Sequence, residues 1–233
     1  MTRFVWAILL GLALSTGASS EPKSVVCVFD EAFPPFTFEQ DGTARGFELD
    51  VLARILKSEG LVLEPSPMHW DAAQEALRSG KADVTSGMGK TAAREKMFNF
   101  ARTPTYDLRI VIWAPDSSPI KGPDDLEGRV VATERGSLYQ QLLEKRGGMT
   151  LKLFETEPEA LDAMVKGEAE AWAGSNPTAH YFAKQRGYQG FGPKGAPLQV
   201  TPIYYVFSSE QGALRDQVSD ALETFKTPPP LPS

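Results

Sequence analysis

The chain has 233 residues, of which 42% are hydrophobic and 23% are charged, and its formal net charge is −6. This composition is typical of a globular protein with enough apolar material for one large core or two modest ones. An acidic chain offers no basic field to a phosphate backbone, so nucleic acid is excluded as a partner.

The N-terminus has the pattern of an export signal. Arg3 precedes the short apolar run VWAILLGLAL, and small residues follow, so we predict a signal peptide over residues 1–20 that is cleaved after Ala18 or Ser20. The run is shorter than the roughly 20 residues that span a bilayer, which favours a signal over a membrane anchor. The mature chain is therefore expected in the periplasm. Cys27 lies in a later apolar run and is interpreted as an inert buried thiol, with a lipid anchor as the alternative.

Strand and helix patterns alternate along the first half. The segment 47–58 carries apolar residues on one helical face and acidic residues in its first turn. In chain order we expect a strand over 25–29, a Pro- and aromatic-rich loop over 32–38, a helix over 47–58, a strand over 61–63, a helix opened by a capping box of Asp71 and Gln74, a strand over 83–88, a helix over 92–98 capped by Thr91, and a strand over 108–113.

The second half repeats this logic after a segment rich in Pro, Ser and Asp, residues 115–123, which we interpret as a domain crossing. We then expect strands over 129–132, 151–154, 169–173 and 203–207, helices starting at Ser137, Thr156 and Asn176, a last helix around 214–222, and a Pro-rich tail over 227–233. Repeated strand–helix units predict an α/β fold with mostly parallel sheets. Ligands of such folds bind at the carboxyl ends of strands, often between domains.

The stretch SGMGKTAAREKMFNF, residues 86–100, contains the GKT of a phosphate-binding Walker loop. That motif also needs a glycine five positions before Gly89, and Val84 stands there, so we reject it. A second interpretation uses the end of a strand, a helix N-terminus and Arg94 in its first turn as a site for a carboxylate. On local chemistry alone, pairing of Arg94 with a surface acid remains equally open.

Five blocks in order decide between these alternatives. They are FDEAFPPFTFEQDGTARGFELDVLARIL, HWDAAQEALRSGKADV, GMGKTAAREKMFNFARTPTY, DDLEGRVVATERGSLYQQLL and EALDAMVKGEAEAWAGSNPTAHYF. With these blocks the chain resembles the family-3 extracellular solute-binding proteins, the polar-amino-acid binding proteins of ABC importers, from about Val25 to Phe225.

The resemblance implies a periplasmic-binding-protein-like fold of type II, in which two α/β lobes are joined by two crossing segments near 108–114 and 200–207. Lobe 1 would comprise residues 21–110 and 204–226, and lobe 2 residues 111–203. A small amino acid or related carboxylate would be trapped between the lobes, and the closed monomer would dock on a membrane permease. No cofactor or metal is implied.

The resemblance also assigns site residues. It implies that Arg94 binds the ligand carboxylate, that Phe33 and Trp70 are aromatic walls and that Asp30 is an acidic group beside them. Gly87 and Met88 would offer backbone groups, and Ser137 would donate a hydrogen bond from a helix N-terminus, where plain capping is the alternative.

Two positions depart from the family pattern. Gly89 stands where the family usually has Thr or Ser, so one hydroxyl is lost. Ser175 stands where the family has the aspartate that binds the ligand amino group. Because a buried ammonium without a carboxylate costs on the order of several kcal/mol, both an α-amino acid and a carboxylate without an amino group remain open.

Two other functions stay open. His69 and His180 lie far apart in the sequence, and neither a catalytic triad nor a metal-ligand spacing is present. An exported enzyme resembling cyclohexadienyl dehydratases would need an acid in the cleft, for which Glu134 and Glu155 are candidates. An exported accessory or sensing protein would bind a ligand without a transporter.

Overall fold

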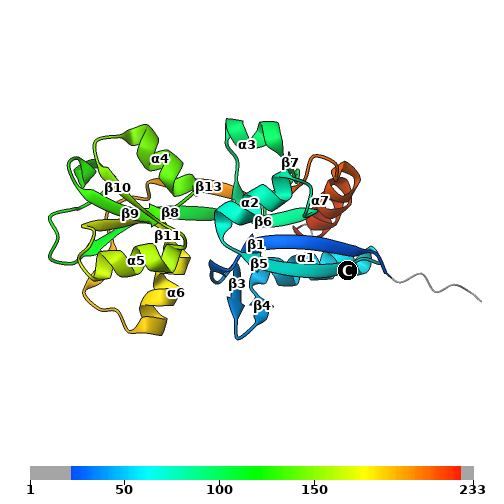
Figure 1. Ribbon diagram of the computed structural model, residues 1–233, viewed down its shortest axis with the longest axis horizontal. Helices are drawn as coiled ribbons and strands as arrows, with labels where there is room; N and C mark the ends of the chain where they lie inside the picture. Colours follow the sequence, from blue (N-terminus) through cyan, green and yellow to red (C-terminus); the bar gives the residue numbers. More distant parts are fainter. Residues whose placement is uncertain (1–21, 227–233) are drawn as a thin grey trace, which may run out of the picture.

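The computed structural model describes residues 22–226, which form two α/β lobes joined by long strands (Figure 1). The predicted signal peptide and the Pro-rich tail lie outside the described residues. One large sheet runs through both lobes in the strand order β10-β9-β11-β8-β13-β6-β1-β5. The predicted fold class is confirmed, and the parallel pairs β1–β5, β1–β6, β9–β10 and β9–β11 follow from the alternating strand–helix pattern.

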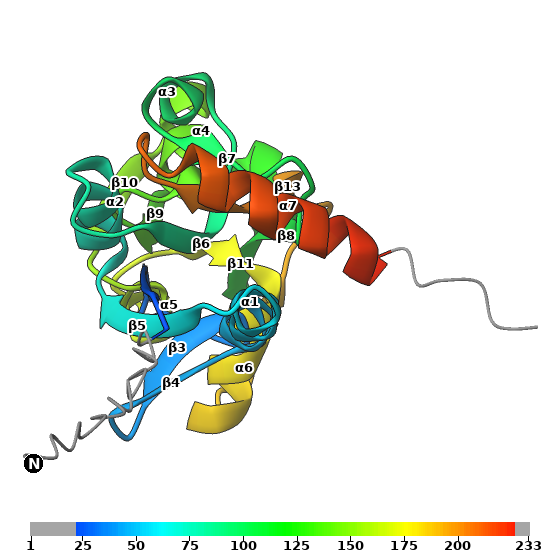
Figure 2. The same ribbon diagram turned by 90° about the vertical axis from the view of Figure 1, so that its right-hand side faces the viewer.

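The first lobe packs helices on both faces of its part of the sheet. Figure 2 shows α1 and α7 on one side and α2 on the other, and each side has its own apolar cluster. The elements are β1 (Ser24–Asp30), α1 (Phe47–Ser58), β5 (Val62–Met68), α2 (Trp70–Arg78), β6 (Val84–Gly89), α3 (Ala92–Met97), β7 (Asn99–Phe100) and α7 (Gly212–Lys226).

The second lobe repeats this two-sided packing. Trp172 lies on the face that α5 and α6 cover, and Leu143 of α4 packs on the opposite face. The elements are the short 3₁₀ helix η1 (Pro123–Leu126), β9 (Val130–Glu134), α4 (Leu138–Arg146), β10 (Thr150–Phe154), α5 (Glu157–Val165), β11 (Ala171–Ser175), α6 (Asn176–Arg186) and β12 (Phe191–Pro193).

Two antiparallel strands, β8 (Tyr106–Pro115) and β13 (Gln199–Phe207), connect the lobes. The crossing segments implied by the resemblance fall within them. Leu108 and Ile203 on these strands pack with Phe33 of the first lobe and Leu138 of the second, so the junction has an apolar centre of its own. The predicted residue ranges of the two lobes stay a prediction.

A small sheet replaces the loop predicted over 32–38. It consists of β2 (Ala32–Phe33), β3 (Thr37–Gln40) and β4 (Thr43–Arg45), and Asp41 and Gly42 join its last two strands. Gly46 closes this sheet onto α1 with φ 127°, and a Cβ there would lie 2.1 Å from the carbonyl oxygen of Phe36. Only glycine fits this approach, which holds Phe33 at the lobe junction.

Two local predictions are wrong. The capping box fails because α2 starts two residues earlier, at Trp70 with His69 as its N-cap, so Asp71 lies inside the helix and Gln74 bonds elsewhere. The domain crossing at 115–123 fails because Ile120 is buried with Leu126 in the core of the second lobe. Between residues 22 and 226, every helix is too short or too polar to cross a bilayer.

Candidate functional site

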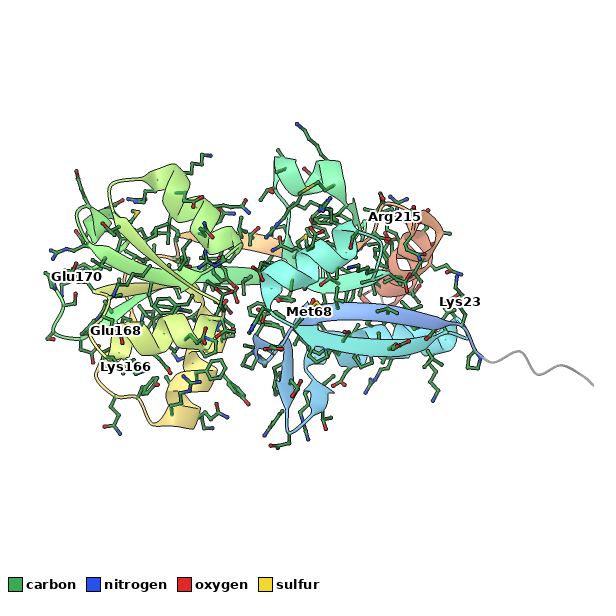
Figure 3. All side chains as sticks on the ribbon, in the orientation of Figure 1. Lys23, Met68, Lys166, Glu168, Glu170 and Arg215 are labelled. Atoms are coloured by element: carbon green, nitrogen blue, oxygen red, sulfur yellow. The ribbon has the colours of Figure 1, made fainter. Side chains whose placement is uncertain are left out.

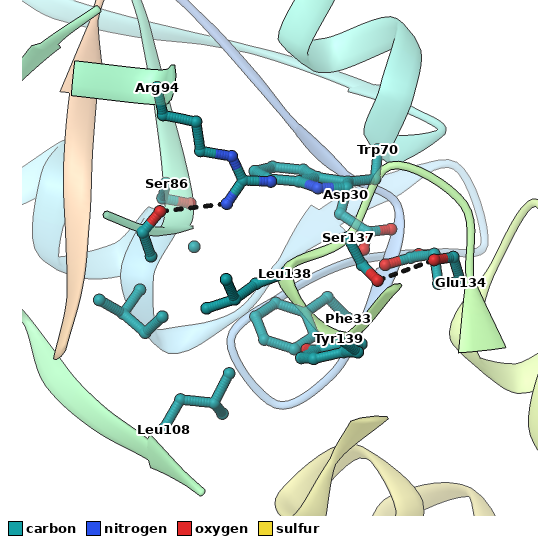
Figure 4. Close-up of a pocket in the computed structure, with 13 residues that line it drawn as sticks. Asp30, Phe33, Trp70, Ser86, Arg94, Leu108, Glu134, Ser137, Leu138 and Tyr139 are labelled. Atoms are coloured by element: carbon teal, nitrogen blue, oxygen red, sulfur yellow. Dashed lines mark hydrogen bonds between the residues drawn. The ribbon is translucent and has the colours of Figure 1, made fainter. Parts of the chain in front are cut away.

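A pocket with about 390 Å³ of space between its atoms opens at the junction of the lobes (Figure 4). Both lobes and both connecting strands contribute to its lining. Seven of the nine predicted site residues line it: Asp30, Phe33, Trp70, Gly87, Gly89, Arg94 and Ser137. Six further residues complete it: Ser86, Leu108, Glu134, Leu138, Tyr139 and Ile203. The roles of the predicted residues in binding remain predictions.

Met88 and Ser175 do not line this pocket. The Met88 side chain is fully buried in the apolar cluster beneath α2. Ser175 caps α6, since its Oγ accepts hydrogen bonds from the backbone N and the Oγ1 of Thr178. Its own backbone N–H donates to Oε2 of Glu157 at 3.4 Å. The Ser175 side chain is therefore used in capping, and a carboxylate lies directly behind it.

Arg94 is the buried cation of the pocket, with 3% of its surface exposed. Nη1 donates to the carbonyl oxygen of Gly89 at 3.1 Å, and Nη2 donates to Oε1 of Gln74 at 3.0 Å and to the carbonyl oxygen of Gly136 at 3.1 Å. The guanidinium lies 5.6 Å from the ring centroid of Trp70. Burial lowers the Arg94 pKa to about 10, so the group remains charged at neutral pH.

The Arg94 charge is not balanced by a direct partner. Within residues 22–226, no carboxylate forms an ion pair with it, and its Nε has no hydrogen-bond partner. By contrast, the guanidinium groups of Arg129 and Arg135 form ion pairs with carboxylates on the surface. A buried, unpaired guanidinium can accept a ligand carboxylate without losing an existing ion pair.

The second lobe contributes the turn before α4 to the pocket. Ser137 caps this helix, because its Oγ accepts from the backbone N of Gln140, and it also donates to the carbonyl oxygen of Glu134 at 2.7 Å. The hydroxyl hydrogen is therefore already used. Gly136, just before it, adopts φ 69° and presents its carbonyl oxygen to Arg94 and Gln74 of the first lobe.

Two buried carboxyl groups, Asp30 and Glu134, line the pocket on the side away from the Arg94 backbone, and a third, Glu157, lies close to them outside the lining. Asp30 ends β1, Glu134 ends β9 and Glu157 begins α5, and their exposed fractions are 5%, 3% and 1%. Burial raises the Asp30 pKa to about 6 and the pKa of Glu134 and Glu157 well above the usual range, and repulsion from Asp30 adds to the shift of both glutamates. Among residues 22–226, no group of three or more ligating side chains is arranged to hold a metal ion.

Close contact with the second lobe explains why glycine, and not the Thr or Ser of the family pattern, stands at position 89. A Cβ there would lie 2.9 Å from Cδ2 of Leu138, so the Thr or Ser of the family pattern would meet the second lobe. Gly87 has φ 79° and a Cβ would lie 3.4 Å from the Phe33 ring. Beside it, Ser86 Oγ is buried with no hydrogen-bond partner in the part of the chain that the structure describes. The unused hydroxyl is a further polar contact for a ligand.

The family model of the bacterial extracellular solute-binding proteins, family 3, matches residues 25–229. The chain belongs to this family.

Relatives with assigned names support the same conclusion. The chain is 24% identical to the L-cystine-binding protein TcyA of Bacillus subtilis, covering 90% of this chain and 79% of the relative. It is 23% identical to a probable amino-acid ABC transporter-binding protein of Haemophilus influenzae, covering 96% and 91%. Among solved structures, the arginine-, lysine-, histidine-binding protein ArtJ from Geobacillus stearothermophilus is 27% identical with a TM-score of 0.81, covering 88% and 90%.

Of the acidic side of the pocket, the sequence predicted only Asp30 as a ligand-site residue. Glu134 was named only as a cleft acid for an enzyme, and Glu157 was not named. The position of Glu134 at the carboxyl end of a strand was the available clue. Glu170 lies at the outer end of the second lobe, where it pairs with Arg129 at 2.8 Å, as expected for a residue away from the ligand (Figure 3).

Proposed function

We propose that this family-3 protein captures a small amino acid between its lobes and delivers it to an ABC importer. The observation that carries the proposal is Arg94, a buried guanidinium in the junction pocket without a carboxylate partner among residues 22–226. A ligand carboxylate supplies the missing charge and can accept from its free Nε.

The pocket favours a small ligand. Its lining comes from both lobes and both connecting strands, and bulky side chains such as Trp70, Leu138 and Tyr139 leave room for a small molecule only. Trp70 and Phe33 offer aromatic faces, and Leu108 and Ile203 offer apolar contacts. Polar groups at two ends of an apolar pocket fix the orientation of a zwitterion.

Capture uses the movement of one lobe against the other. The pocket is shared between the lobes, and β8 and β13 are the strands about which they hinge. We infer that the protein works as a monomer in the periplasm, that the closed form docks on the permease of the importer, and that it performs no chemical step on its ligand. The names of two relatives, an L-cystine-binding protein and a probable amino-acid ABC transporter-binding protein, support this role.

Thermal melting and calorimetric titration of the mature chain test the proposal. The panel is the standard amino acids with L-cystine. A ligand at about 100 times its dissociation constant adds roughly 2.7 kcal/mol of stability. We expect at least one amino acid to stabilise the wild type and Arg94→Ala to bind it at least about 30-fold more weakly. The control Arg78→Ala removes an exposed guanidinium that pairs with Glu75 and should bind as the wild type does. Equal binding by Arg94→Ala would contradict the proposal.

A further inference from the structure

The buried carboxyl groups of the pocket come from opposite lobes. Asp30 belongs to β1 of the first lobe and Glu134 to β9 of the second. Their carboxyl groups face each other in Figure 4, close enough for a side-chain hydrogen bond. Closure of the lobes therefore brings two acids together in a site from which water is largely excluded.

Among residues 22–226, two buried oxygens of these acids have no hydrogen-bond partner, although Glu134 lies within hydrogen-bonding reach of Asp30 and the Tyr139 side chain bonds to Glu157. Asp30 accepts one hydrogen bond, from the backbone N of Ala32 at 2.9 Å. Oε1 of Glu134 and Oε1 of Glu157 are buried without a partner in the part of the chain that the structure describes. Buried acceptors without a donor are costly, so this cluster is incomplete until a donor enters it.

Charge identifies the donor. Three carboxyl groups stand against one guanidinium, and Arg94 forms no ion pair with any of them within residues 22–226. Two carboxylates this close cannot both ionise in a dry site unless a cation lies between them. In the free protein the raised pKa of Glu134 relieves the repulsion by keeping that carboxyl protonated, whereas a bound ammonium group lets both carboxyls ionise and donates to the unused oxygen.

The family position for the amino group cannot take this role here. Ser175 is fully buried, caps α6 and does not line the pocket. Glu157 receives the backbone N–H of Ser175, so the negative charge lost at residue 175 is present one side chain away. The acidic function has therefore moved from β11 to the ends of β1, β9 and the start of α5.

We propose that the ligand's ammonium group binds between Asp30 and Glu134, with Glu157 behind them, and that it acts as the bridge that holds the two lobes closed. This inference rests on the proposed function and names its specificity: the ligand must carry an amino group as well as a carboxylate. A carboxylate without an amino group reaches Arg94 but brings no cation to the two acids, so it binds weakly and does not close the lobes.

Matched ligand pairs test the proposal. The probes are L-arginine against 5-guanidinopentanoate, L-glutamine against 4-carbamoylbutanoate, and L-leucine against 4-methylpentanoate, together with the tightest amino acid of the wider panel and its analogue without the amino group. Calorimetry gives the dissociation constants, and small-angle X-ray scattering gives the radius of gyration with and without ligand. The proteins are the wild type, Glu134→Gln, Asp30→Asn and the control Glu155→Gln, which neutralises a half-exposed carboxylate paired with Arg135.

We expect the wild type to prefer the amino acid over its analogue by at least about 30-fold and to become more compact only with the amino acid. In Glu134→Gln and Asp30→Asn, this preference should fall to a few-fold, while binding of the analogue is kept or improved. The free variants should melt no lower than the wild type, because each loses one of the repelling buried acids. This combination separates loss of the ammonium site from a folding defect.

Two outcomes overturn the proposal. One is a wild-type protein that binds and closes equally well with both members of a pair. The other is a Glu134→Gln variant that keeps the wild-type preference. If Arg94→Ala loses amino-acid binding in the same experiments, either outcome removes only the ammonium site and leaves the proposed function intact. If the wild type binds no amino acid at all, the proposed function and this inference both fail.

Discussion

Glu48 lies beneath the pocket and makes the electrostatics of the first lobe measurable. Its side chain is fully buried, and Oε1 accepts a hydrogen bond from Oγ1 of Thr105 at 3.0 Å. Oε2 has no hydrogen-bond partner among residues 22–226. Burial raises its pKa from 4.5 to about 8, and the hydrogen bond from Thr105 lowers it in part. The carboxyl is therefore protonated in the folded protein at neutral pH.

The sign of the pH effect follows from this shift. Between pH 4.5 and 8 the folded state holds the Glu48 proton and the unfolded state has released it, so the unfolding free energy falls as pH rises. The slope is about 1.4 kcal/mol per pH unit, which gives about 2.5 kcal/mol between pH 5 and pH 7. Glu48→Gln replaces the titrating carboxyl with an amide and so removes this pH-dependent contribution. The variant should gain about 2.5 kcal/mol relative to the wild type over that interval.

Urea denaturation at pH 5 and pH 7, followed by tryptophan fluorescence, measures the difference. The other raised carboxyls of the pocket are present in both proteins and cancel. Burial also raises the pKa of the nearby Tyr106 and Tyr205, so both remain neutral in this window. Glu39→Gln, at an exposed position, is the matched control. Its unfolding free energy should differ from that of the wild type by the same amount at pH 5 and at pH 7. A gap between wild type and Glu48→Gln that stays constant within about 0.5 kcal/mol would refute the reasoning.

Two further substitutions probe the walls of the pocket. Trp70→Ala should weaken amino-acid binding and lower the free energy of unfolding by about 3–5 kcal/mol, because it removes a buried ring that supports Arg94, whereas Trp70→Phe should keep most of both in calorimetry and urea denaturation. Gly136→Ala should cost about 1–2 kcal/mol of stability for its positive φ and also weaken binding, because its Cβ would lie 3.3 Å from Nε2 of Gln74. Gly60→Ala has a similar φ and open space around it, so it should show the stability loss alone; equal binding losses in the two variants would contradict this account.

The sequence predicted those elements whose local pattern agrees with their packing. The bounds of α1 were predicted as they stand, since its apolar residues repeat at helical spacing and pack into one core. The start of α2 was wrong because Asp71 and Gln74 match a capping box in sequence, while contact with the second lobe directs the Gln74 side chain to Gly136. Local chemistry did not contain that contact.

The residues of the site also fall into those that the sequence predicted and those that only the fold brings together. Arg94, Phe33 and Trp70 were found from the sequence because they lie in blocks whose order and spacing resemble one family. The meeting of Asp30 with Glu134 could not be predicted, since 104 positions separate them and only the closed arrangement of two lobes brings them together. The absence of an acid at Ser175 left open a ligand without an amino group, whereas in our proposal the buried acids of the neighbouring elements bind the amino group.

A crystal structure of the complex with the amino acid that binds most tightly tests the central claim most directly. The account predicts the ligand carboxylate within about 3 Å of the Arg94 guanidinium and the ammonium within about 3 Å of Asp30 and Glu134, with the lobes closed. A ligand bound in the opposite orientation, or outside the pocket between the lobes, would contradict it.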